Sequence, residues 1–152
     1  MNSTLPTESD FVTYPETPDL DQVYAWRNFG GLTLDEAKTR FAENSLHYQE
    51  DFMYMGTNAF AFYFPVIDWW LRSVPERNEP FDDSEAWILA EGIQIQFRDD
   101  ALDRLRPLIP AVMDLASYVT SHLSRFGDDE DQRRVQDAWT ELENRLRTIA
   151  ST

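Results

Sequence analysis

The sequence contains no cysteine, and that absence excludes several kinds of site at once. Without thiols the chain can form neither disulfides nor thiolate metal sites, and it has no cysteine nucleophile. It also lacks a phosphate-binding glycine loop, a Gly-x-Ser-x-Gly elbow and a His-Glu-x-x-His motif. We therefore predict no catalytic residues, no cofactor and no metal, and a non-catalytic protein is favoured over an enzyme.

Long apolar runs are missing as well. The longest, from Ala59 to Leu71, is shorter than the roughly 20 residues that cross a bilayer, and Asp68 interrupts it. Residues 1–11, MNSTLPTESDF, show no basic region followed by an apolar core, which a signal peptide would have. These features predict a protein outside the membrane, and the cytoplasm is its simplest location.

Basic residues are scarce. Lysine and arginine total 13 against 28 aspartates and glutamates, which gives a formal net charge of -15. Such a chain repels the phosphates of nucleic acids and anionic membrane surfaces, so we expect neither as a partner. The same charge favours a basic protein partner, because opposite electrostatic fields steer the encounter of two proteins.

Aromatic residues, in contrast, are concentrated in residues 52–71. Each such side chain buries roughly 150–250 Å² on folding, so this stretch offers more apolar surface per residue than any other. Apolar residues cover every face between residues 60 and 70, which is typical of a helix surrounded by protein. Pro65 lacks an amide donor and predicts a kink or a break near Phe64. The aromatic residues of the stretch are Phe52, Tyr54, Phe60, Phe62, Tyr63, Phe64, Trp69 and Trp70.

The chain on both sides of this stretch predicts amphipathic helices. Residues 1–17 are polar and read as an extended or mobile lead-in, followed by a single helical domain over residues 18–152. Thr33 and Glu36 have the spacing of a capping box, which marks a helix start. The last helix has an apolar stripe at steps of four and three residues, made by Val135, Trp139, Leu142, Leu146 and Ile149. Its predicted i,i+4 ion pairs are Glu130–Arg134, Glu141–Arg145 and Glu143–Arg147.

Residues 84–98 are compatible with two structures. Apolar residues alternate with Gln94 and Gln96 over residues 93–97, which is strand periodicity. The segment also has the length of a helix, and a lone strand would need a partner that the sequence does not offer. We predict an all-α fold, a compact single-domain bundle of six or seven helices around the central aromatic-rich helix. The alternative is an α+β fold with a short strand near 93–97.

Two acidic runs and one aromatic residue are the candidates for a partner-binding site. Each run also suits a helix start, because carboxylates complement the positive end of the helix dipole. The functional interpretation is that the runs present carboxylates to basic side chains of a partner, beside an exposed aromatic anchor. The candidates are Asp82, Asp83, Glu85, Asp128, Asp129, Glu130, Asp131 and Trp26.

Four polar residues near the aromatic stretch form an alternative set: His47, Glu50, Asp51 and Asp68. A helix would place Glu43, His47 and Glu50 on one face, but the chain lacks the repeated Glu-x-x-His motif of di-metal bundles. Asp68 is interpreted as a partner of Arg72 at the i,i+4 spacing, or as a buried carboxylate with a raised pKa.

Two functions are consistent with these patterns. The first is a non-catalytic acidic protein-binding module that masks a basic partner, as small acidic inhibitors and immunity proteins of bacterial toxins do. The alternative is a small-ligand binder or enzyme with an aromatic-lined pocket around residues 47–70. Surplus aromatic residues also leave a homodimer open.

Overall fold

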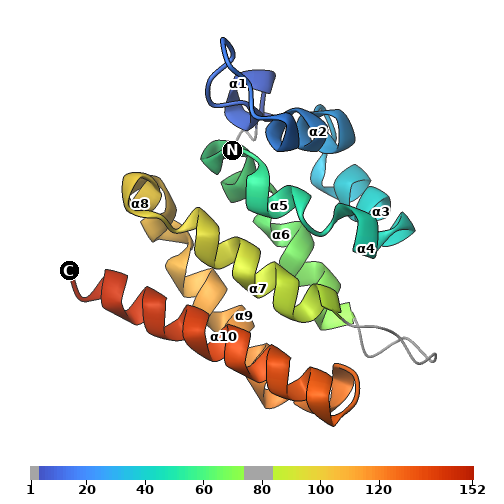
Figure 1. The fold of residues 1–152 in the computed structure, drawn as a ribbon, viewed down its shortest axis with the longest axis vertical. Coiled ribbons are helices and arrows are strands. Elements are labelled where there is room, and N and C mark those ends of the chain that lie inside the picture. The colour runs from blue at the N-terminus through green and yellow to red at the C-terminus, as the bar shows by residue number, and fades with distance from the viewer. Residues whose placement is uncertain (1–3, 74–83) are drawn as a thin grey trace.

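The computed structural model describes residues 4–73 and 84–152, and every regular element in these ranges is a helix (Figure 1). The all-α prediction is confirmed, and no strand forms at 93–97. Within the described ranges, six helices have ten residues or more: α2 (Leu20–Phe29), α3 (Leu34–Glu43), α6 (Thr57–Ser73), α7 (Ser84–Gln96), α9 (Ile109–Ser121) and α10 (Asp129–Ala150). The shorter elements are α1 (Glu8–Phe11), α4 (Ser45–Tyr48), α5 (Asp51–Tyr54), α8 (Leu102–Leu105) and the 3₁₀ turns at 99–101, 106–108 and 123–125.

The aromatic stretch at residues 52–71 covers most of α5 and nearly all of α6. α6 contacts α1, α3, α7 and α9, and its Phe60 and Ile67 side chains are fully buried. A kink or a break was predicted near Phe64; the helix is continuous through Pro65, so the break is wrong and the kink stays a prediction. A proline inside a helix costs about 3 kcal/mol. Burial of Phe60 and Ile67 on either side, at roughly 1.5–3 kcal/mol each, offsets that cost.

The alternation of apolar and polar residues at 93–97 arises from a buried glutamine side chain, Gln96, and not from a strand. Gln96 is fully buried at the end of α7. Its side-chain nitrogen donates hydrogen bonds to the backbone carbonyls of Phe52 and Met55, at 2.9 and 2.7 Å. Carbonyls in the last turn of a short helix lack partners within it, so Gln96 satisfies the end of α5. Ile95, the residue before it, is 51% exposed, because successive residues of a helix lie about 100° apart around its axis.

Residues 1–17 were predicted to be an extended or mobile lead-in, but their described part, residues 4–17, is anchored to the core. It contains α1, whose Phe11 ring is fully buried and lies edge-on to Trp26, with centroids 5.3 Å apart. Gly56, at the start of α6, donates its backbone N–H to the Phe11 carbonyl at 2.9 Å. A Cβ atom at Gly56 would collide with the Asp10 carbonyl oxygen, so glycine permits this close approach. The segment is held against the rest of the chain because the Phe11 side chain is part of the hydrophobic core.

The C-terminal half consists mainly of three long helices, with α10 packed against both α7 and α9 (Figure 1). The apolar stripe predicted for α10 is confirmed as its buried face. Within that stripe, the Trp139 indole donates a hydrogen bond to the Ala86 carbonyl at 2.7 Å, which ties α10 to the first turn of α7. Within the described ranges, none of the helices combines the length and the hydropathy that a membrane span requires.

Candidate functional site

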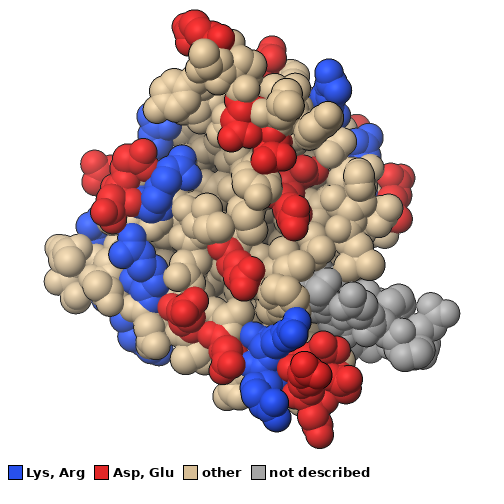
Figure 2. Space-filling model, viewed as in Figure 1, with Lys and Arg blue, Asp and Glu red and all other residues tan. Residues whose placement is uncertain are grey.

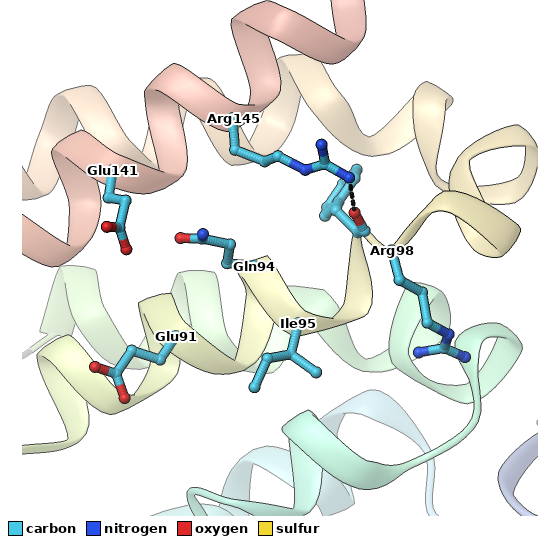
Figure 3. A pocket seen from close by; sticks show the side chains of 7 residues that line it. Glu91, Gln94, Ile95, Arg98, Glu141 and Arg145 are labelled. Atoms are coloured by element: carbon cyan, nitrogen blue, oxygen red, sulfur yellow. Dashed lines mark hydrogen bonds between the residues drawn. The ribbon is translucent and has the colours of Figure 1, made fainter.

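A groove runs along the exposed sides of α7 and α10. Two cavities, of 590 and 330 Å³, lie along it, and Glu91 and Glu141 line both of them. Figure 2 shows the face of the molecule on which α7 and α10 lie, and Figure 3 shows the larger cavity from close by. We call this surface the α7–α10 groove. Its α7 side is formed by Trp87, Glu91, Gln94 and Ile95, continuing to Arg98, and its α10 side by Arg134, Asp137, Glu141 and Arg145.

Helical spacing places these residues in line. Glu91 follows Trp87 by four residues and Ile95 follows Glu91 by four, so the three lie along one side of α7. On α10, Asp137, Glu141 and Arg145 are also four residues apart. The sequence analysis missed this site, although the two rows are visible in the sequence. Nothing in the sequence indicates that α7 and α10 lie side by side.

Three carboxylates occupy the middle of the groove: Glu91, Asp137 and Glu141. Throughout the described ranges, none of the three has an ion-pair or hydrogen-bond partner. Acidic side chains extend down the middle of this face in Figure 2, while several basic ones gather toward its edges. Unpaired like charges at close quarters repel one another, so this surface favours a cationic group from outside.

The groove is acidic because Arg145 turns away from Glu141. Arg145 donates a hydrogen bond to the Phe97 carbonyl at 3.0 Å (Figure 3). It also forms an ion pair with Asp99 at 3.2 Å. The Phe97 carbonyl follows the last residue of α7 and needs a donor from outside that helix. The predicted Glu141–Arg145 pair is therefore wrong. Arg145 binds the carbonyl at the end of α7 instead, so it does not neutralise Glu141.

Apolar surface adjoins these charges. Ile95 points from α7 to the side away from α10 (Figure 3), where half of its surface is exposed. Trp87 is half-buried, and the Arg134 guanidinium lies 5.5 Å from its ring centroid. Tyr54, on the adjacent α5, is also exposed. The surface thus combines carboxylates in the middle of the groove with exposed apolar surface to one side of it, and protein interfaces also combine apolar and charged groups.

Part of the predicted partner-binding set lies outside the described residues. Asp82 and Asp83 fall in the undescribed range, and for Glu85 only the backbone, within α7, is described. Trp26 is not the exposed anchor that was predicted. It is half-buried, and the edge-on contact with Phe11 holds it against the core. Aromatic burial of this kind leaves only part of the Trp26 surface for a partner.

The acidic run at 128–131 has a structural role at the start of α10. Asp128 caps the helix by accepting a hydrogen bond from the Asp131 backbone N–H at 3.0 Å. Glu130 lies 3.9 Å from Arg134, in the predicted i,i+4 pair. Asp129 and Glu130 are exposed. A docking role for this run stays a prediction, and the run is the rival of the α7–α10 groove.

The alternative set is only partly brought together. Asp68 is engaged by Arg72 at 3.1 Å, the i,i+4 pair considered from the sequence. His47 and Glu50 are exposed, and the His47 ring lies edge-on to Tyr48. The cavities lined by described residues, from 330 to 590 Å³, include none of the four side chains.

Asp51, the fourth member, is the described carboxyl group whose pKa is raised most clearly. It is half-buried at the start of α5, and burial raises its pKa to about 6. A hydrogen bond from Asn28, at 2.8 Å, and the charge of His47 act in the opposite direction, while Asp21 and Glu50 add to the rise. The described His, Asp and Glu side chains form no cluster of three or more that could hold a metal ion. A carboxyl group that titrates near neutrality is a chemical feature that a catalytic function could use.

Comparison with known proteins leaves the site to be interpreted from its own geometry. No protein-family model matches the chain, and no curated protein or solved structure gives a significant match. We therefore infer function from the surface that the structure presents.

Proposed function

We propose that the chain is a non-catalytic protein-binding module that masks a basic partner, and that the partner docks on the α7–α10 groove. The observation that carries this proposal is the unpaired set of Glu91, Asp137 and Glu141 beside the exposed Ile95. The analogy to acidic inhibitors and immunity proteins rests on charge and size alone.

The net charge of the chain acts on a partner at long distance, and the carboxylates of the groove act on it at short distance. The net charge of -15 attracts a basic protein from a distance and speeds the encounter. At physiological salt the screening length is about 8 Å, so only nearby carboxylates hold the complex once it has formed. The groove carboxylates act at this short range, and apolar contact with Ile95 adds affinity that salt does not screen.

The test compares two surfaces that carry the same charge change. The groove variant combines Glu91→Gln with Glu141→Gln, and the rival variant combines Asp129→Asn with Glu130→Gln. Each raises the formal net charge by two. The wild-type chain and both variants are used to capture partners from the native lysate at increasing salt, and the captured proteins are identified and their isoelectric points compared.

We expect the wild type to capture a basic protein at low salt, with loss as salt rises. The groove variant should lose most of that protein, and the rival variant should keep it. Equal loss by both variants would mean that net charge alone drives capture and that no groove is involved. Retention by the groove variant and loss by the rival would move the docking site to the start of α10. Capture of no basic protein, or capture that salt does not weaken, would overturn the masking function.

A second candidate, a small-ligand binder or enzyme, is favoured by one observation, the raised pKa of Asp51. It predicts that a small molecule raises the unfolding temperature of the chain, and that Asp51→Asn abolishes the shift. A thermal-shift screen with metal analysis tests it. A several-degree shift that requires Asp51 would favour this candidate over masking.

A further inference from the structure

We infer that the segment of the partner that occupies the α7–α10 groove is an amphipathic α-helix with basic residues in its central turns. This inference rests on the proposed function and names the kind of structure that the groove receives. It depends on the shape of the groove, on the order of charges along it and on the elements that border it.

The common modes of peptide recognition leave the helix as the best fit. Strand addition needs an exposed sheet edge, and the described ranges contain only helices and turns. Proline-rich segments dock between exposed aromatic rings. The exposed lining of this groove has Trp87 as its aromatic residue, since Phe97 is fully buried. A helix in a groove needs two neighbouring walls. Here α7 supplies apolar and charged positions at helical spacing, and α10 supplies mainly charged ones.

The dimensions agree with this mode. α7 has 13 residues, and at 1.5 Å per residue it spans about 20 Å. A third helix packs against such a pair with its axis about 8–10 Å away. Glu91 comes from one helix and Glu141 from the other (Figure 3). Basic side chains three or four residues apart on a docked helix lie on one face and can therefore approach both walls.

The order of charges along the groove restricts the partner further. The carboxylates of Glu91, Asp137 and Glu141 lie between Arg134 at one end and Arg98 with Arg145 at the other. A docked helix should therefore carry lysine or arginine in its central turns and neutral or acidic residues at its ends. Each of these arginines of the groove is paired with a carboxylate, from Glu130, Asp100 and Asp99 respectively. The ends of the groove therefore do not attract a basic side chain as its middle does.

The test uses three synthetic peptides of about 14 residues, the length that spans about 20 Å as a helix. The first places leucine at helical spacing with lysine in the central turns and glutamine at the ends. The second has the same composition in strict alternation, which favours an extended strand. The third keeps the helical pattern but moves the lysines to the ends. Binding to the full chain is measured by titration calorimetry, and contacts are mapped by backbone amide shifts.

We expect the first peptide to bind at least tenfold more tightly than the other two, to become helical on binding, and to shift amides of α7 and α10. The groove variant, Glu91→Gln with Glu141→Gln, should weaken it about tenfold, which corresponds to about 1.4 kcal/mol. The rival variant, Asp129→Asn with Glu130→Gln, should change it less than twofold.

Two kinds of failure are distinguishable. If the alternating peptide binds as well as the first and the groove variant weakens both, the groove binds basic chains but the helical form of the partner is wrong. If the third peptide, with lysines at its ends, binds as tightly as the first, the inference that the basic residues lie in the central turns is wrong. If no peptide binds saturably, or if both variants weaken binding equally, the proposed masking function fails together with the inference.

Discussion

Two helices that both pack against α7 are stabilised in different ways. α10 has 22 residues, a continuous buried stripe and its own cap at Asp128. α5 has four residues, and hydrogen bonds from distant parts of the chain satisfy it: Gln96 donates to its carbonyls and Asn28 donates to Asp51. A helix of several turns can stabilise itself through its own periodicity, whereas a single turn depends on donors from elsewhere. The contrast predicts that single polar substitutions matter around α5 and hardly matter on α10.

The largest effect is expected for Gln96→Leu. This change removes the donor that satisfies the carbonyls of Phe52 and Met55, and unpaired buried groups cost about 1–3 kcal/mol each. Leucine also removes the Gln96 Oε1, which is buried without a partner among the described residues. We therefore expect a net fall of about 2 kcal/mol in the free energy of unfolding, measured in urea titrations. Gln94→Leu is the matched control, since Gln94 is half-buried in the groove lining and should change stability by less than about 0.5 kcal/mol. Equal effects of the two changes would refute the dependence of α5 on Gln96.

An intermediate effect is expected for Asp51→Asn, and it should depend on pH. Burial raises the folded pKa to about 6, above the ordinary value of 3.8 for an aspartate. The folded state therefore binds this proton more tightly than the unfolded chain does, so the stability that the group contributes is present below pH 4 and is lost as pH rises through 6. Asparagine cannot ionise and can still accept the Asn28 hydrogen bond.

We expect Asp51→Asn to be more stable than wild type by about 1–2 kcal/mol at pH 7, a value reduced for residual exposure, with no difference at pH 4. Unfolding curves at pH 4, 5, 6 and 7 measure this, with the exposed Glu16→Gln as a control that should not change the profile. A stability difference that is constant over this range would show that the Asp51 carboxyl does not titrate as described.

The smallest effect is expected on α10. Glu130→Gln removes an ion pair with Arg134 that is 3.9 Å long and mostly exposed. Such pairs contribute about 0.2–0.5 kcal/mol, so the unfolding temperature should fall by less than about 2 °C in calorimetry. A loss above about 1 kcal/mol would remove the contrast with α5, because α10 would then also depend on single polar contacts.

The sequence was sufficient to predict contacts whose two residues lie within a few positions of each other on one helix. Thr33 and Glu36 form the predicted capping box, with bonds of 3.2 and 2.9 Å. The Asp68–Arg72 pair also forms as considered. These contacts depend on spacing along one helix, which the sequence states directly. The alternation at 93–97 suggested a strand as the alternative structure, although the segment is helical. Gln96 is polar at a buried position because it donates hydrogen bonds to carbonyls of α5, some forty positions earlier in the chain.

The amino-acid sequence by itself determined the helical class, the buried stripe of α10 and the acidic charge, because these follow from periodicity and composition. The tertiary structure decided which carboxylates remain unpaired. Arg145 could bond to Glu141 on its own helix or to the Phe97 carbonyl at the end of α7, and it takes the carbonyl together with Asp99. A carbonyl at a helix end has no donor within that helix, whereas an exposed carboxylate can remain solvated by water. That competition exists only once α7 and α10 are side by side, so the groove and its free carboxylates are a property of the packed fold.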